Sequence, residues 1–195
     1  MADGILKVGT ITTSSGSGTI TLGQSGETVT IPTGATITNS GTATGFGGTN
    51  TPAFAVNIDA HQTISSATDT IIAMNQETLD TAGAFNLSNY RFTPQVAGKY
   101  AIYLTMVAFA DANSRLQTTM CGIRKNGSNL ENHLAQAEVD SSSNNGKKMA
   151  VNSHAIVTLN GSSDYVDFLA YVIVSSGVAK LHVDMTSAMG FKLTE

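Results

Sequence analysis

The fold is decided by residues 74–104, which read MNQETLDTAGAFNLSNYRFTPQVAGKYAIYL. Four residues separate Asp80 from Phe85, six separate Phe85 from Phe92, and five separate Phe92 from Gly98. After Gly98 the side chains alternate along the chain, as they do in a β-strand, where successive residues point to opposite faces. Several spacings recur at once, so they are a more specific signal than apolar alternation alone.

This spacing resembles the signature of the complement one-q globular-head family, whose members are relatives of tumour necrosis factor. That family places an aromatic residue six positions before the Asp, whereas this chain has Met74. Residues 189–193, which read MGFKL, resemble the closing strand of the family. The resemblance covers about Phe54 to Leu193. It implies a ten-stranded jelly-roll β-sandwich that assembles as a trimer, and it leaves open what the trimer binds.

The composition narrows the range of partners. The chain has 195 residues, which is enough for one domain with a core and an appendage. Charged residues make up 12% and the net charge is −4, so we expect no basic surface for nucleic acid. The sequence shows neither a signal peptide nor an apolar run approaching the ~20 residues of a membrane span. We therefore expect synthesis in a cytoplasm and no membrane insertion.

Residues 1–52 differ in composition from the rest of the chain. They contain 30 Ser, Thr or Gly residues and three charged ones. Apolar β-branched residues recur at spacings of 9, 9 and 8, each flanked by Thr on both sides; they are Ile11, Ile20, Val29 and Ile37. This period predicts short β rungs separated by Gly-rich turns, with a core so thin that partner chains must complete it. The alternative is a flexible Gly/Ser/Thr linker.

The domain organisation follows from this contrast. We expect an all-β protein with a β-rich arm or stalk in residues 1–52, whose Gly-rich end at 41–52 forms a neck. The family resemblance implies that residues 53–195 form a jelly-roll head. Only one of the twelve aromatic residues precedes residue 53, so we expect the head to fold by itself and the arm to depend on it.

The opening of the chain carries a second resemblance. Residues 4–12, which read GILKVGTIT, and the Thr/Gly-rich run through residue 48 resemble the N-terminal segments of tail-fibre and other structural proteins of marine tailed phages. This resemblance implies a place on the virion surface after synthesis in the bacterial host cytoplasm. The apolar residues nearest the end, Ile5, Leu6 and Val8, are then the expected anchor to other virion proteins.

Two strands of the head are apolar on both faces. In residues 100–109 and again in residues 165–174, both alternating sets of side chains are mostly apolar. A lone sandwich exposes one face of each sheet, so we expect a neighbouring subunit to cover the second face of the sheet that carries these strands. The residues expected at the trimer interface or in the core are Tyr100, Ile102, Leu104, Met106, Tyr165, Leu169, Tyr171 and Ile173.

Polar turns separate the strands of the head. Asn126-Gly127 predicts a hairpin turn, and a second turn is expected at residues 159–164. Exposed loops carry binding function more often than strands do. The loop residues expected to contact a host glycan or receptor are Asp111, Asn113, Asn126, Ser142, Asn144 and Asn145.

No catalytic motif stands out. The four histidines are far apart in sequence and lack metal-ligand spacing, and no nucleophile elbow, Walker loop or dinucleotide fingerprint is present. Cys121 lies among strand residues and is expected to be a packed apolar side chain. Relatives in the complement one-q family sometimes bind calcium, for which Asp111, Asp140 and Asp164 are possible ligands, although their spacing carries no loop signature. We expect no enzyme activity, no metal and no cofactor.

The sequence therefore favours a homotrimeric virion protein of a tailed phage, either a short fibre, a spike or a capsid decoration. Two alternatives stay open. One is a structural cement protein that binds only capsid subunits, and the other is a soluble bacterial lectin-like module.

Overall fold

The structure is a computed structural model that describes residues 9–13, 18–38, 40, 51–110, 116–139 and 146–193. The chain divides into two compact units, residues 1–44 and residues 45–195, and each is described by itself. The first strand of the second unit begins at Ala53, where the sequence places the start of the head. Among the described residues, no helix is long and apolar enough to cross a membrane.

The second unit is built from β-strands and one short 3₁₀ turn. Its described residues form thirteen strands rather than ten, because several edge segments are counted as strands of two or three residues. The elements are β1 (Ala53–Asn57), β2 (Gln62–Ile64), β3 (Thr70–Ile71), β4 (Gln76–Asp80), β5 (Phe85–Asn86), β6 (Arg91–Phe92), β7 (Gly98–Ala110), β8 (Leu116–Lys125), β9 (Ser128–Glu138), β10 (Lys148–Leu159), β11 (Val166–Val174), β12 (Ala179–Leu181), η1 (Val183–Met185) and β13 (Ser187–Lys192).

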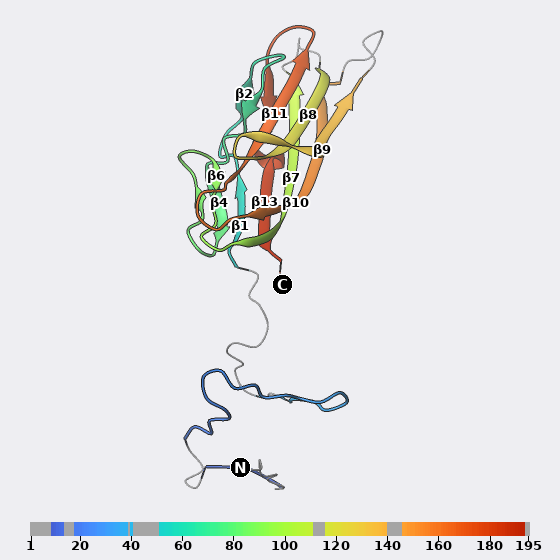
Figure 1. The fold of residues 1–195 in the computed structure, drawn as a ribbon. Coiled ribbons are helices and arrows are strands. Elements are labelled where there is room, and N and C mark those ends of the chain that lie inside the picture. Colours follow the sequence, from blue (N-terminus) through green and yellow to red (C-terminus); the bar gives the residue numbers. More distant parts are fainter. Residues whose placement is uncertain are drawn as a thin grey trace. The chain divides into compact units, whose positions relative to one another are not determined.

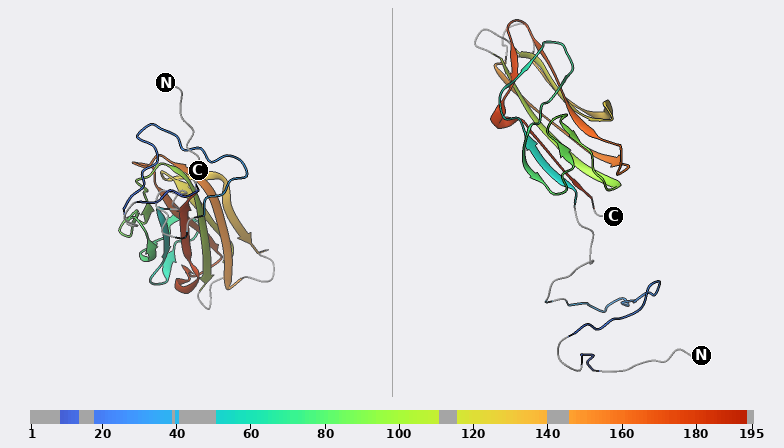
Figure 2. Two further views of the ribbon diagram at one scale, coloured as in Figure 1. Left: turned by 90° about the horizontal axis from the view of Figure 1, so that it is seen from below. Right: turned by 90° about the vertical axis from the view of Figure 1, so that its left-hand side faces the viewer.

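These strands form two antiparallel sheets that face each other (Figures 1 and 2). Sheet A has the order β2-β12-β7-β13-β1-β4, with β10 paired along the free edge of β7. Sheet B has the order β5-β6-β11-β8-β9, with β3 also paired to β11. The arrangement is a jelly-roll β-sandwich, which confirms the predicted fold class of the head.

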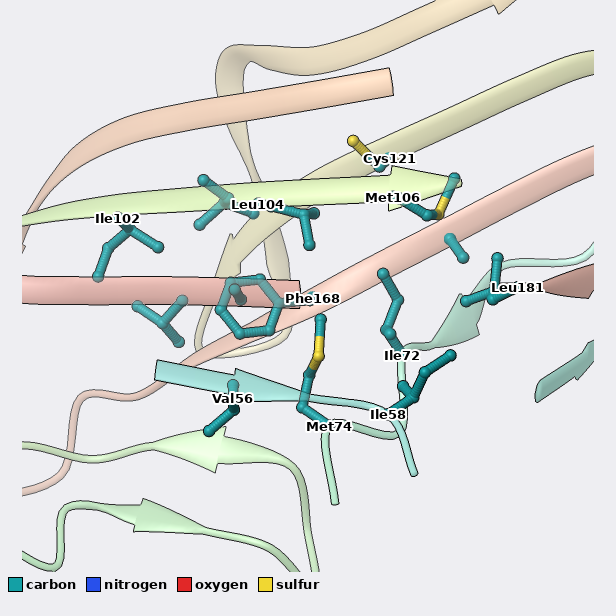
Figure 3. Close-up of a cluster of buried hydrophobic side chains, with 14 of the residues drawn as sticks. Val56, Ile58, Ile72, Met74, Ile102, Leu104, Met106, Cys121, Phe168 and Leu181 are labelled. Carbon is teal, nitrogen blue, oxygen red and sulfur yellow. The ribbon is translucent and has the colours of Figure 1, made fainter. Parts of the chain in front are cut away.

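The core lies between the sheets and takes side chains from both. Phe54 of sheet A lies against Phe92 and Phe168 of sheet B, with ring centroids 4.4 and 6.4 Å away. Figure 3 shows the neighbouring aliphatic part of this core, where β7 side chains point toward Phe168 of β11. Met74, which replaces the aromatic residue of the family signature, is fully buried there (Figure 3). An unbranched Met fills an irregular core position that a ring would otherwise occupy.

The signature residues have identifiable structural roles. One carboxylate oxygen of Asp80 accepts hydrogen bonds from the backbone N–H groups of Ala82 and Ala84 at 3.2 and 3.0 Å. The other oxygen accepts from the N–H of Phe85 at 2.8 Å. These bonds close the turn after β4 and direct the Phe85 ring into the core, 5.3 Å from Phe54. The four-residue separation of the acid and the aromatic is therefore the length of this turn.

The described residues of the first unit, 9–13, 18–38 and 40, contain no strand. The periodic residues are between 43% and 57% exposed; they are Ile11, Ile20, Val29 and Ile37. One apolar side chain every eight or nine residues cannot offset the entropy of ordering a single chain. The β rungs expected in the arm are therefore not formed there by one copy, and a stalk completed by partner chains stays a prediction.

Candidate functional site: an exposed apolar face of sheet A

The outward face of sheet A carries large apolar side chains in the open. Tyr103 on β7 is 45% exposed, Ile156 on β10 is 66% exposed, and Met189 on β13 is 51% exposed. These strands are direct neighbours, and Tyr103 stands opposite Met189 across the β7–β13 pair. Across the β7–β10 pair, Ile156 is opposite Ala101, which is the neighbour of Tyr103 on the same face of β7. The three side chains thus form one patch rather than scattered apolar residues.

The patch extends across five adjacent strands. Phe191 on β13 stacks near Tyr103, with 6.4 Å between ring centroids. On the next strand Ala55 is opposite Met189, and beyond it Leu79 of β4, which is 48% exposed, is opposite Ala55. We call this surface the sheet A face and define it by the residues Leu79, Tyr103, Ile156, Met189 and Phe191.

Two open grooves flank the ridge formed by Tyr103 and Met189. The first, of about 450 Å³, is lined mainly by apolar groups that include Tyr103, Ile156, Phe191 and Leu193. The second, of about 520 Å³, lies beyond Met189 and has mixed walls that include the polar residues Asn57 and Asp184. A ridge between two grooves can interlock with side chains of a partner, whereas a flat polar sheet face cannot.

An exposed apolar surface of this kind needs an explanation. Monomeric soluble proteins seldom expose large contiguous apolar patches, and such patches commonly mark an interface. Interfaces of obligate oligomers resemble a protein core cut in half. The sheet A face therefore has the composition and shape of a protein–protein contact.

The sequence-predicted residues on β7 lie elsewhere. Tyr100, Ile102, Leu104 and Met106 are at most 1% exposed and belong to the core. Strand parity explains this placement, because a core-facing row leaves the alternate row, which contains Tyr103, on the outside. Of the two roles expected for these residues, the structure gives them the core.

The predicted residues on β11, together with Tyr165 just before it, face outward from sheet B. β7 and β11 lie in different sheets, so the expectation that one sheet carries both strands is wrong. Leu169 is only 2% exposed within the single chain, and Tyr165, Tyr171 and Ile173 are half-buried. The chain itself covers much of this second face, so the apolar residues of β11 do not require a neighbouring subunit.

The predicted hairpin turn at Asn126-Gly127 is confirmed, with φ values of 52° and 79°. Asn126 is exposed, but its side chain is engaged: its Nδ2 donates to Asp164 at 2.8 Å and its Oδ1 accepts from the N–H of Tyr165 at 3.0 Å. Asn126 thus ties two turns together. The other loop candidates, Asp111, Asn113, Ser142, Asn144 and Asn145, and the anchor residues Ile5, Leu6 and Val8 lie outside the described residues.

The proposed calcium ligand Asp164 already has partners on both oxygens. Lys125 Nζ lies 2.8 Å from Oδ2, which also accepts from the Asn160 N–H at 3.1 Å. The hydrogen bonds from Lys125 and Asn126 lower the pKa of the Asp164 carboxyl. Asp111 and Asp140 lie outside the described residues, and the described part of the chain holds no cluster of three or more metal-binding side chains.

Cys121 is fully buried on β8, which confirms the prediction of a packed side chain. Burial raises the pKa of its thiol from 9.0 to about 12. Because the thiolate is the nucleophilic form, this cysteine has almost no reactive species near neutral pH.

The sequence reasoning missed Ile156 and Met189. On β10 the outward row contains Asn152, His154 and Thr158, and Ile156 interrupts this polar row. An exposed contact surface could have been predicted from Ile156, because it is a large apolar residue in a row of otherwise polar side chains.

Comparisons with known proteins agree with the observed architecture. The structure is similar to the globular domain of the zebrafish complement 1qA protein, with 15% identity, a TM-score of 0.50, and coverage of 73% of this chain and 96% of that one. It is similar to murine APRIL, with 14% identity, a TM-score of 0.53, and coverage of 72% and 98%. It is also similar to Eiger TNF from S. frugiperda, with 12% identity, a TM-score of 0.51, and coverage of 72% of this chain and 91% of that one.

No protein-family model matches the sequence, and no curated protein matches it either. At 12–15% identity the structural likeness shows the fold alone. The head therefore has the jelly-roll fold of complement one-q and tumour necrosis factor domains, as its signature spacing predicted.

Proposed function

We propose that the protein is a homotrimer in which the sheet A face forms the contact between subunits. The observation that carries this proposal is the exposure of Tyr103, Ile156 and Met189 side by side on adjacent strands. Assembly removes these side chains from water, which is the main favourable contribution to most protein association. The sequence resemblance to a trimeric family supports the same stoichiometry.

The proposed role of this trimer is that of a virion structural protein of a tailed phage, as a short fibre, a spike or a capsid decoration. The support is the opening of the chain, where residues 4–12 resemble phage fibre proteins. The arm attaches the trimer through Ile5, Leu6 and Val8, and the head faces solvent. Three identical heads on one axis turn a weak contact with a host surface into useful binding through avidity.

The composition of the arm suits this attachment. It has three charged residues in 52, so its backbone can lie against another subunit at little desolvation cost. In the described residues of the arm the apolar side chains are exposed, which leaves them available to a partner.

The oligomeric state is tested by sedimentation velocity of the full chain. A trimer at micromolar concentration is the expected result. A stable monomer under these conditions contradicts the proposal, because the sheet A face would then be permanently exposed.

The virion role is tested by deletion of residues 2–12 in the phage. The expected result is particles that lack the protein, while the purified variant stays trimeric. A matched variant keeps the full length of the arm and replaces Ile5, Leu6 and Val8 with Ser. It shows whether loss of these side chains alone, without shortening of the arm, is enough to release the protein. Copurification of the deletion variant at wild-type occupancy would instead assign docking to the head.

A further inference from the structure

Two guanidinium groups converge on one buried carboxylate on the outer face of sheet B. Arg124 approaches Asp167 with both prongs, Nε to Oδ1 at 2.7 Å and Nη2 to Oδ2 at 2.9 Å. Arg91 Nε lies 3.9 Å from Asp167 Oδ2. The Asp167 side chain is 3% exposed, and Arg124 alone balances its charge. Arg91 therefore leaves one surplus positive charge here, in a chain whose net charge is −4.

Arg91 is held in place without using its donors. Its Cζ lies 3.9 Å from the centroid of the Tyr165 ring, which is cation–π geometry. Its side chain is 40% exposed, and it donates no hydrogen bond to any described residue. A stacked guanidinium keeps its in-plane N–H groups available, and their fork matches the two oxygens of a carboxylate.

Two ordered turns fix the positions of these side chains. The Asn126 side chain accepts from the Tyr165 N–H at 3.0 Å, and the Asn126 N–H donates to the Tyr165 carbonyl at 3.0 Å. Tyr90, which precedes Arg91, adopts φ 61°, an outlying conformation for a bulky residue. Its N–H donates to the Asn86 carbonyl at 2.8 Å. Such preorganisation reduces the cost of ordering a binding site.

We propose that Arg91 binds the carboxylate of an acidic saccharide on the outer face of sheet B. This inference rests on the proposed attachment function and names its ligand class and its site. A single surplus charge with a planar fork suits a carboxylate. The neighbouring turns at 126–127 and 160–164 consist of polar residues and glycine, which suit a hydrophilic saccharide better than an apolar peptide. Asn126 is then a positioning residue that orients Tyr165 beneath Arg91.

The binding test uses the purified full chain and isothermal titration with a short oligogalacturonate. Its methyl ester, which has the same sugars without the charge, is the matched probe. We expect binding of the acid that weakens with salt and no binding of the ester. Equal binding of the ester would overturn the role of the carboxylate.

Variants locate the site. Arg91→Gln should weaken oligogalacturonate binding about tenfold or more, because a charge-assisted two-pronged contact is lost. Arg91→Lys keeps the charge but not the fork, and it should fall between wild type and Arg91→Gln. The control is Lys99→Gln, which removes an equal charge from an exposed position on sheet A and should change affinity by no more than about twofold. Because Arg124 still pairs with Asp167, Arg91→Gln should keep the wild-type melting temperature.

Other results overturn the proposal. If Lys99→Gln weakens binding as much as Arg91→Gln, the binding is a nonspecific electrostatic attraction and does not occur at a defined site. If poly-aspartate binds through Arg91 as tightly as oligogalacturonate, the ligand is an acidic peptide. Arg91-dependent binding by a protein that is monomeric or absent from virions keeps the site and refutes the proposed function. A virion trimer that binds no acidic saccharide refutes the proposed Arg91 site and keeps the proposed function.

Discussion

The outer faces of the two sheets start from similar strands and end in different surfaces. β7 and β11 both carry apolar side chains on both of their faces. On the outward face of β7, Tyr103 is 45% exposed, whereas on the outward face of β11, Leu169 is only 2% exposed. Sheet B covers itself with half-buried side chains and the Arg124–Asp167 pair. Sheet A covers Phe109 with the rings of His61 and His182, 4.8 and 5.5 Å away, but leaves Tyr103, Ile156 and Met189 exposed. A strand with two apolar faces can be covered by its own chain, as in sheet B, or left exposed, as at Tyr103 in sheet A, where we propose that a second chain covers it.

The largest expected effect breaks the sheet A face. Ile156→Asp places a charge within the proposed contact, where three copies would have to desolvate it, at a cost on the order of several kcal/mol for the trimer. We expect a folded monomer in sedimentation velocity at micromolar concentration. Ile156 is 66% exposed in the single chain, so the fold itself should tolerate the change.

A matched control sharpens this comparison. Tyr171→Asp adds the same charge to the outer face of sheet B. We expect a charge at the sheet B position to leave the trimer intact. Dissociation by Tyr171→Asp together with an intact trimer in Ile156→Asp would move the interface to sheet B.

The next effect breaks the cover of sheet B. Asp167→Asn leaves Arg124 half-buried without its counter-charge, and we expect the free energy of unfolding to fall by about 3 kcal/mol. Urea denaturation of the head measures this change. The control is Asp164→Asn, which removes a less buried carboxylate, 14% exposed, that pairs with Lys125 at a surface turn, and it should cost less. Equal losses in the two variants would mean that burial of the Asp167 pair is unimportant.

A smaller effect comes from the core that both sheets share. Cys121→Ala should lower the free energy of unfolding by about 1–2 kcal/mol at neutral pH through lost packing. Because burial raises the thiol pKa to about 12, the folded protein holds this proton more tightly than the unfolded chain does. The contribution of the thiol is complete below pH 9 and declines as pH rises toward 12. The gap between wild type and variant should therefore narrow in that window, and a constant gap would contradict the burial argument.

The smallest effect concerns the arm. Removal of residues 1–50 should change the free energy of unfolding of the head by less than about 0.5 kcal/mol per chain, because all the strands of the described residues lie in the head and the buried Pro52, which accepts a hydrogen bond from the Lys192 N–H, is kept. Circular dichroism of residues 1–52 alone should show no cooperative melt. A cooperative melt would show that the arm carries its own stability.

The sequence predicted the head well where information is local. The spacing of Asp80 and Phe85 encodes a turn closed by three hydrogen bonds from backbone N–H groups to the Asp80 carboxylate, and Asn126-Gly127 encodes a hairpin. Alternation also assigned the side chains of β7 to two rows correctly. These features depend on bond geometry within a few residues, which a sequence displays directly.

The orientation of those rows depended on distant residues. An ideal Cβ on Gly190 would lie 2.6 Å from Ile102 and 2.7 Å from Phe54, so these three residues pack together from separate parts of the chain. That packing turns the Ile102 row inward and Tyr103 outward, and no local pattern contains it. The stacking of Arg91 on Tyr165 is hidden in the same way.

The first and last strands of the head lie side by side. Ala53 is opposite Phe191 in the antiparallel pair of β1 and β13, and the Lys192 N–H donates to the Pro52 carbonyl at 3.1 Å. A pulling force applied at these two points would load the hydrogen bonds one after another, because antiparallel bonds run perpendicular to the strands. The head should therefore unzip at low force when pulled by its own ends. A load carried from residue 53 to the far sheet would instead have to break many bonds at once, which makes the direction of pull the main determinant of mechanical strength.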